Sequence, residues 1–355
     1  MQSLNIGIAG AGLLGRLVAW TLAHAGHRVS VFDPAAGPAP SFAGQGAAGF
    51  TAAGMLSPMA ERETADADLA QRGWQSIARW RRIADQLEQA SPGIPKLFEQ
   101  HGSLLVAHGS DQGAARRVLA RLVDGTEPGT AAQPQALDAA ALLQLEPSLH
   151  STMGRLHAWM LAGEAHIDTV RTLQHLHTDA PAVQWHWAQA VQDIQPGRLD
   201  DRHFDWAFDL RGVGAKATCA VRGVRGEMVW LHAPGLGLKR PVRLLHPRHR
   251  VYVVPRPGDV VLVGASEIET EDRSPMSLRS AVELMAAAHS VLPALAESRI
   301  LRMDTNLRPA LPDHRPQCHV EPGLVRINGL YRHGWLLGPS LVDEALSQTG
   351  LLSPA

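Results

Sequence analysis

The chain has few cysteines, few lysines and no long apolar run. Its two cysteines, Cys219 and Cys318, are too few for a disulfide framework or a zinc array, and they favour free thiols in a reducing cytoplasm. No apolar stretch reaches the ~18 residues that a membrane-spanning helix needs, so we expect no membrane span. Basic and acidic residues nearly balance, at 33 Lys+Arg against 34 Asp+Glu, which argues against a nucleic-acid partner.

Length and composition indicate a globular chain. Of its 355 residues, 45% are apolar and 19% are charged, which excludes a disordered chain and a coiled coil. At ~100–200 residues per domain, this length predicts about two domains. The spacing of the histidines and cysteines predicts no metal site.

The amino-terminal segment has the pattern of a dinucleotide-binding unit. An apolar run over residues 4–9 predicts a buried strand, and Gly10, Gly12 and Gly15 follow it at the start of a helix with apolar spacing. Glycines at this spacing allow a tight turn, close approach of a pyrophosphate and packing of the helix on the strand. A second predicted strand ends at Asp33, whose carboxylate is placed to accept both ribose hydroxyls. This unit alone does not separate FAD from NAD.

Further glycine-rich turns lie far along the chain. The segment 51–57 is small and apolar, and it lets backbone lie close to a flat ring. A second turn lies at 212–214, residues 224–267 are typical of an antiparallel sheet, and a last turn spans 329–338. Pro339 predicts a helix that begins near it, since proline is tolerated in the first turn. The order of these segments predicts a discontinuous cofactor domain that is interrupted by a sheet-based domain.

Together these segments resemble the FAD-dependent D-amino acid oxidase family, and most closely its glycine oxidase branch. The resemblance covers nearly the whole chain. It rests on the glycine turn with Asp33 and on the following motifs: Ala53-Gly-Met-Leu56, Val224-Arg-Gly-Glu227, Tyr252-Val-Val-Pro-Arg256, Val263-Gly-Ala265, Leu307-Arg-Pro309 and Gly329-Leu-Tyr-Arg-His-Gly-Trp-Leu-Leu-Gly-Pro339.

The resemblance implies an α/β fold with two domains. The first is a discontinuous Rossmann-like FAD-binding domain, and the second is an α+β substrate domain built on an antiparallel sheet. We expect residues 1–85, 150–222 and 303–355 in the FAD-binding domain. We expect residues 86–149 and 223–302 in the substrate domain.

The resemblance also implies an extended FAD along the first domain. The glycine turn would hold the pyrophosphate and Asp33 the adenosine ribose, while 53–56 would line the isoalloxazine and Val191 the adenine region. The turn at 212–214 would close over the pyrophosphate, and 334–337 would offer backbone N–H groups to the flavin O2/N1 edge. The expected FAD-binding residues are Gly10, Gly12, Leu13, Leu14, Gly15, Asp33, Ala53, Gly54, Met55, Leu56, Val191, Gly212, Gly214, Gly334, Trp335, Leu336 and Leu337.

Four residues are the candidates for substrate contact. By the resemblance, Arg308 would bind a substrate carboxylate through two hydrogen bonds, and Tyr252 would donate its hydroxyl to the same carboxylate. Arg332 matches a further family arginine near the pocket. Glu267 departs from the branch, in which this position is apolar and faces the substrate, so we hypothesise that glycine is not the best substrate. Alternatively, Glu267 points to solvent or pairs with a nearby arginine.

The implied reaction is oxidation of the C–N bond of a small amino acid or amine by hydride transfer to flavin N5. The product is an imino acid, which hydrolyses to an oxo acid and ammonia. Oxygen is the expected electron acceptor, although a quinone-linked dehydrogenase of the same fold would keep these residues. A tRNA wobble-uridine side-chain oxidase of this fold and a nicotinamide-dependent dehydrogenase remain alternatives. Whether the chain forms a homo-oligomer stays open.

Overall fold

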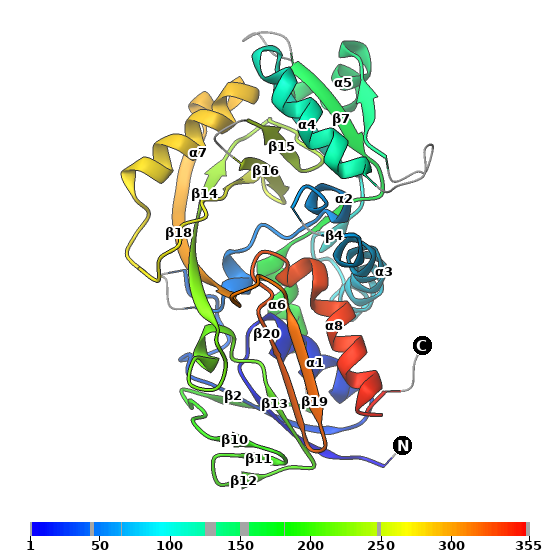
Figure 1. Ribbon diagram of the computed structural model, residues 1–355, viewed down its shortest axis with the longest axis vertical. Helices are drawn as coiled ribbons and strands as arrows, with labels where there is room; N and C mark the ends of the chain where they lie inside the picture. The colour runs from blue at the N-terminus through cyan, green and yellow to red at the C-terminus, as the bar shows by residue number, and fades with distance from the viewer. Residues whose placement is uncertain are drawn as a thin grey trace.

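Two large β-sheets form the framework of the protein. The computed structural model describes residues 2–42, 46–64, 66–124, 133–149, 156–180, 182–246 and 250–352. A six-stranded sheet lies in the lower half of Figure 1 and an eight-stranded sheet in its upper half. The long strands β14 (Arg222–His232) and β18 (Arg299–Ala310) run between the two halves.

The six-stranded sheet carries the amino-terminal unit at its centre. Strand β1 pairs in parallel with β2 on one side and with β13 on the other, and only the edge strand β19 is antiparallel. In spatial order the strands are β19 (Gln317–Glu321), β20 (Leu324–Asn328), β13 (Trp206–Asp209), β1 (Asn5–Ala9), β2 (Arg28–Asp33) and β9 (Gln184–Trp187). The unit predicted over residues 4–33 is therefore confirmed.

The eight-stranded sheet is antiparallel, as expected, except where β15 pairs in parallel with β5. Its strands in spatial order are β18 (Arg299–Ala310), β14 (Arg222–His232), β17 (Val260–Gly264), β16 (Arg250–Arg256), β15 (Val242–Leu245), β5 (Ser103–His108), β7 (Leu156–Leu161) and β6 (Gln135–Leu137). A small three-stranded sheet comprises β3 (Met55–Leu56), β8 (Ala165–Ile167) and β4 (Phe98–Glu99). A second one comprises β10 (Ile194–Gln195), β11 (Arg198–Leu199) and β12 (Arg202–His203).

Helices cover both large sheets (Figure 1). They are α1 (Leu13–His24), α2 (Pro58–Glu61), α3 (Ala67–Ala90), α4 (Gln112–Val123), α5 (Ala139–Leu145), α6 (Thr169–Thr178), α7 (Leu278–Val291) and α8 (Gly334–Gln348). Short 3-10 turns are η1 (Ala48–Thr51), η2 (Gly109–Asp111), η3 (Pro147–Leu149), η4 (Gly212–Ala215) and η5 (Pro293–Glu297). Within the described ranges, none of these helices has the length and apolarity to span a bilayer.

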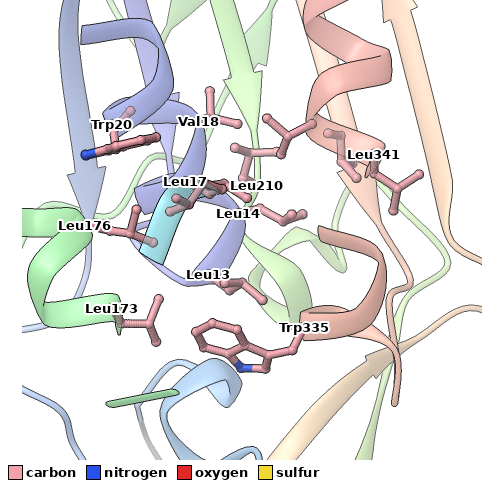
Figure 2. Close-up of a cluster of buried hydrophobic side chains, with 14 of the residues drawn as sticks. Leu13, Leu14, Leu17, Val18, Trp20, Leu173, Leu176, Leu210, Trp335 and Leu341 are labelled. Atoms are coloured by element: carbon pink, nitrogen blue, oxygen red, sulfur yellow. The ribbon is translucent and has the colours of Figure 1, made fainter. Parts of the chain in front are cut away.

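Helix α1 forms the centre of the largest hydrophobic core. Figure 2 shows Leu13, Leu14, Leu17 and Val18 of α1 between side chains of α6 and α8. The contacting side chains include Leu173 and Leu176 of α6 and Trp335 and Leu341 of α8. Burial of apolar side chains on two flanks fixes the position of α1, so the turn that precedes it is held rigidly.

Gly10 and Gly15 at the start of α1 leave no room for larger residues. Gly10 has a φ of 103°, in the left-handed region that favours glycine, and a Cβ there would lie 2.6 Å from the carbonyl oxygen of Leu210. A Cβ on Gly15 would lie 1.8 Å from the carbonyl oxygen of Gly10. Gly15 therefore allows α1 to pack directly on the turn, as its place in the sequence predicted.

Helix α8 begins earlier than Pro339 predicted. It starts at Gly334, which places Pro339 inside the helix. Proline has no N–H for the carbonyl four residues before it, which here belongs to Trp335. The indole Nε1 of Trp80 donates to that carbonyl at 2.7 Å instead. A tertiary contact from α3 thus satisfies the acceptor and lets the helix extend through the proline.

We propose to move two of the expected domain boundaries, because each assigns part of the eight-stranded sheet to the first domain. Residues 150–222 were assigned to the first domain, and residues 150–155 lie outside the described part of the chain. Strand β7, however, pairs with β5 and β6 in the eight-stranded sheet. Strand β18 likewise pairs with β14 as far as Ala310, past the boundary expected after residue 302. The substrate domain then extends through Leu161 in the first case and through Ala310 in the second.

Substitution of Gly15 tests the close packing of α1 on the turn. We expect Gly15→Ala to lower the free energy of unfolding by about 3 kcal/mol, because the added methyl group would overlap a backbone oxygen that has no space to move. Thermal unfolding followed by circular dichroism measures this change. The matched control is Gly113→Ala in α4, where the nearest atom to an added Cβ is 4.0 Å away. A Gly15→Ala melting temperature equal to that of the control would contradict the packing argument.

Candidate active site

A cavity of about 1330 Å³ extends from the glycine turn to the eight-stranded sheet. It is larger than the ~300–1,000 Å³ of ordinary small-molecule pockets, as an extended dinucleotide together with a substrate would require. The expected site residues that line it are Gly10, Gly12, Leu13, Leu14, Asp33, Ala53, Gly54, Met55, Val191, Gly212, Gly214, Tyr252, Glu267, Arg308, Arg332, Gly334 and Trp335. Segments that are far apart in the sequence therefore meet around one space.

Four expected FAD-binding residues do not line the cavity. Gly15 packs against the glycine turn, as described above. Leu56, Leu336 and Leu337 are buried in the core around α1, with Leu56 fully enclosed. If they act on a cofactor, they act through their backbone or by supporting the residues that line the cavity.

The nucleotide end of the cavity is built from α1 and the end of β2. The amino terminus of α1 has unpaired N–H groups and a partial positive charge, which favour a phosphate. Asp33 accepts hydrogen bonds from the N–H groups of Ala11, at 2.6 Å, and Ala35, at 2.8 Å. These bonds fix the carboxylate beside the turn, and each oxygen keeps a further lone pair for a ribose hydroxyl.

Arg16 is a residue at this end that sequence reasoning missed. It is almost fully buried, and it donates to the carbonyls of Ala11, Pro38 and Leu173 at 2.9 Å each. Burial lowers the pKa of Arg16 to about 10, a shift that the charge of Asp33 opposes, so the side chain stays protonated at neutral pH. Arg16 thus joins three segments that enclose the nucleotide end. The sequence does contain a signal for this role, because Arg16 is a charged residue among the apolar residues of the predicted helix.

The amino terminus of α8 forms another wall of the cavity. Among the described residues, no protein acceptor takes the N–H groups of Gly334, Trp335 and Leu336. The N–H of Leu337 donates to the carbonyl of His333 at 2.7 Å, so the expectation of a free donor at Leu337 is wrong. The helix starts early enough for its fourth N–H to find an acceptor inside the chain. Three donors and the positive end of the helix remain at this wall.

At the opposite end, Arg308 has no acidic partner among the described residues. Its Nη1 donates to the carbonyl of Ser266 at 3.0 Å. The guanidinium lies so close over Gly226 that a Cβ there would be 2.5 Å from its Cζ atom. Gly226, another residue that sequence reasoning missed, therefore makes room for Arg308. The arrangement leaves the charge of Arg308, which lines the cavity, without an acidic partner among the described residues.

Tyr252 lines the same end of the cavity. It lies opposite Gly264 on the neighbouring strand, where a Cβ would be 2.9 Å from the tyrosine hydroxyl oxygen. Burial raises the pKa of Tyr252, although the charge of Arg308 opposes this shift. The hydroxyl therefore keeps its proton at neutral pH and can donate a hydrogen bond to an anion beside Arg308.

Arg332 and Glu267 interact with each other. Arg332 lies 3.4 Å from Oε2 of Glu267 and 3.3 Å from Oε2 of Glu61, and it also donates to Oγ1 of Thr64 at 2.8 Å. Of the interpretations offered for Glu267, the geometry favours pairing with a nearby arginine. Arg332 in turn is less available than Arg308 as a ligand for a substrate carboxylate.

Glu61 and Arg243 were not foreseen at this end of the cavity. Glu61 ends α2 and lies 3.2 Å from Nη2 of Arg243 on β15. Burial alone would raise the pKa of Glu61, but the charges of His333, which is protonated only at acidic pH, and of Arg243 and Arg332 outweigh this and lower the pKa to about 2. No spacing in the sequence links positions 61 and 243, because an α2 residue meets a β15 residue only in the folded chain.

The arrangement of sheets, glycine turn and cavity is that of a flavin-dependent oxidoreductase. The model of the FAD dependent oxidoreductase family, DAO, matches residues 5–341, and the chain belongs to this family. FAD is its cofactor, and the glycine cradle and the cavity fit that group.

One relative by sequence and two solved structures with the same fold are similar to this chain. The chain is 36% identical, over 96% of its length and 95% of the relative's, to a protein of Rhizobium etli named "Putative thiamine biosynthesis oxidoreductase ThiO". Glycine oxidase from Bacillus cereus ATCC 14579 has a similar structure, with a TM-score of 0.81 at 20% identity, over 98% of this chain and 95% of that one. Iminodiacetate oxidase from Chelativorans sp. BNC1 gives a TM-score of 0.76 at 22% identity, over 96% and 94% of the two chains.

Removal of Arg16 tests the nucleotide end of the site. We expect Arg16→Met to weaken FAD binding by roughly two orders of magnitude, because three carbonyls lose their donor and the segments that they belong to separate. Fluorescence titration of the apoprotein with FAD measures the dissociation constant. Arg28→Met, at an exposed position of β2, is the control. Equal FAD affinity in the two variants would show that Arg16 does not organise the nucleotide end.

Proposed function

We propose that the chain oxidises the C–N bond of a small amino acid or amine, with glycine, sarcosine and D-amino acids as the substrate class. The observation that supports this most strongly is Arg308, a cation that lines the cavity and has no carboxylate partner among the described residues. An uncompensated guanidinium in a partly enclosed site favours a carboxylate ligand. The names glycine oxidase and iminodiacetate oxidase, which two structural neighbours carry, are consistent with such a substrate.

Arg308 and Tyr252 would bind the substrate carboxylate together. The planar guanidinium offers two parallel N–H groups, and the protonated hydroxyl of Tyr252 offers a third donor. With the carboxylate fixed at two places, the carbon that bears the nitrogen has little freedom to move. Such alignment is itself a large part of the rate increase in an oxidation without covalent chemistry at the protein.

Bound FAD supplies the acceptor for a hydride from the carbon next to the nitrogen. The amine has only to be neutral, so no protein base is required. Glu61 and Glu267 also line the cavity, and both are held in ion pairs with arginines, which makes them poor bases. The N–H groups at the start of α8 would stabilise negative charge that develops along their wall.

The product of this step is an imino acid, which water hydrolyses to an oxo acid and ammonia. We propose oxygen as the final electron acceptor, with a quinone as the second candidate. The reducing cytoplasm that the free Cys219 and Cys318 favour, and the hypothesis that Glu267 disfavours glycine, stay predictions.

An anaerobic screen of amino acids tests the proposed function. We expect the visible absorption of the FAD-loaded protein to be bleached by at least one of glycine, sarcosine and D-alanine. Addition of air should restore the colour with release of hydrogen peroxide, whereas recovery with a quinone and not with air would replace oxygen by the second acceptor. If no small amino acid bleaches the flavin, the proposed function is wrong.

Substitution of Arg308 tests carboxylate binding. We expect Arg308→Lys to lower kcat/KM by about 100-fold while FAD stays bound, because a point charge cannot make the paired hydrogen bonds of a guanidinium. Stopped-flow reduction with sarcosine gives the rate and the substrate affinity. The control is Arg299→Lys, an exposed position on the same strand. A kcat/KM within a fewfold of the wild type would exclude Arg308 as the carboxylate ligand.

A further inference from the structure

Glu61 lies between two arginines that come from different parts of the fold. Its Oε1 atom is 3.2 Å from Nη2 of Arg243, and its Oε2 atom is 3.3 Å from Nη2 of Arg332. Glu61 belongs to α2, Arg243 to β15 of the eight-stranded sheet, and Arg332 to the turn before α8. The ring of His333 is 3.6 Å from the same Oε2 atom. One partly buried carboxylate therefore connects three elements at the substrate end of the cavity.

The charged side chains at the substrate end of the cavity nearly cancel one another. Arg308, Arg243, Arg332 and Glu61 all lie close enough to the Tyr252 hydroxyl to affect its pKa. Glu267 pairs with Arg332, so three cations face two carboxylates and leave one net positive charge. Burial lowers the pKa of His333, which keeps that ring neutral at pH 7. One positive charge balances one carboxylate of a substrate whose amine is neutral.

Two further cations that line the cavity, Arg121 and Arg250, belong to a separate group. Arg121 and Arg250 pair with Glu63, at 3.3 and 3.5 Å between nitrogen and oxygen atoms. Both side chains are more than half exposed, so water screens their charges. The charge balance around Tyr252 is therefore set by an inner group of five residues: Arg243, Arg308, Arg332, Glu61 and Glu267. Glu61 is the more buried of its two carboxylates.

We propose that Glu61 determines substrate specificity. Its negative charge leaves one net positive charge at the substrate end of the cavity, which favours amino acids with one carboxylate and disfavours those with two. This inference rests on the proposed function. Glu61 acts on the substrate through the field at Arg308 and Tyr252 and through the position of Arg332. It is a specificity-determining and positioning residue and does not take part in the chemistry.

Removal of this negative charge should have opposite effects on two kinds of substrate. With a neutral residue at position 61, the inner group has two net positive charges, and a second carboxylate on the substrate gains attraction. Arg243 and Arg332 also lose the anion that holds them beside each other. A substrate with one carboxylate gains nothing from the added charge, and it loses a well-ordered binding site.

The test compares sarcosine with N-(carboxymethyl)glycine, which differs from sarcosine by a second carboxylate on the N-methyl carbon. Anaerobic stopped-flow reduction of the FAD-loaded full chain gives kcat/KM for each. We expect Glu61→Gln to raise the ratio of the dicarboxylate to the monocarboxylate value by about tenfold. We expect Arg243→Met, which removes a positive charge from the same pair, to lower that ratio by a similar factor.

Glu63→Gln is the matched control. Glu63 lies two residues further along the chain and also contacts two arginines, but these are the exposed Arg121 and Arg250. The control should leave the ratio within about threefold of the wild-type value. Glu61→Gln and Arg243→Met should then shift it in opposite directions, which a structural role alone would not produce.

Two results would overturn the inference. Equal losses for both substrates in Glu61→Gln would show that Glu61 merely supports the fold. A shift in the same direction for Glu61→Gln and Arg243→Met would show that charge is not the cause. If Glu61→Gln fails to retain FAD, Arg243→Met decides by itself: a lowered ratio supports the inference, and an unchanged or raised ratio overturns it. Absence of flavin reduction by any amino acid in the wild type would instead refute the proposed function, and this inference with it.

Discussion

The uncompensated charge of Arg308 is the constraint on which the substrate end of the protein depends. Among the described residues this guanidinium is held by backbone carbonyls and not by a carboxylate, so its attraction for an anion is available to a ligand. Its position requires the absence of a side chain at Gly226 on the neighbouring strand β14. Strand pairing between β14 and β18 thus fixes both the cation and the space that it occupies.

Two arginines at the same end of the cavity, Arg308 and Arg332, differ in whether their charge is compensated. Arg332 is engaged by Glu61, Glu267 and Thr64, whereas Arg308 meets carbonyl oxygens alone. Paired arginines are held in one geometry and attract anions weakly, because their charge is already compensated. A partly buried ion-pair group beside a cation without an acidic partner therefore gives a site with a defined shape and a limited net charge.

The nucleotide end was largely predictable because its determinants are local. The strand, the glycine turn with Gly10 and Gly15, the helix and Asp33 fall within about thirty consecutive residues, and each imposes a steric or hydrogen-bonding condition on its neighbours. The start of α8 was misplaced, because Trp80 of α3 satisfies the carbonyl that Pro339 leaves without a donor. A sequence pattern does not show such a donor, which lies more than 250 positions away.

Local pattern by itself determined the turn, the elements around it and the kinds of side chain available for a carboxylate. Spacing and residue type suffice there, since backbone sterics act between near neighbours. Tertiary structure decided which charges meet: it placed Glu61 against Arg243, Glu267 against Arg332, and left Arg308 without an acidic partner among the described residues. Electrostatic energy depends on distance in space, and the distances between these groups exist only once the two sheets have packed around one cavity.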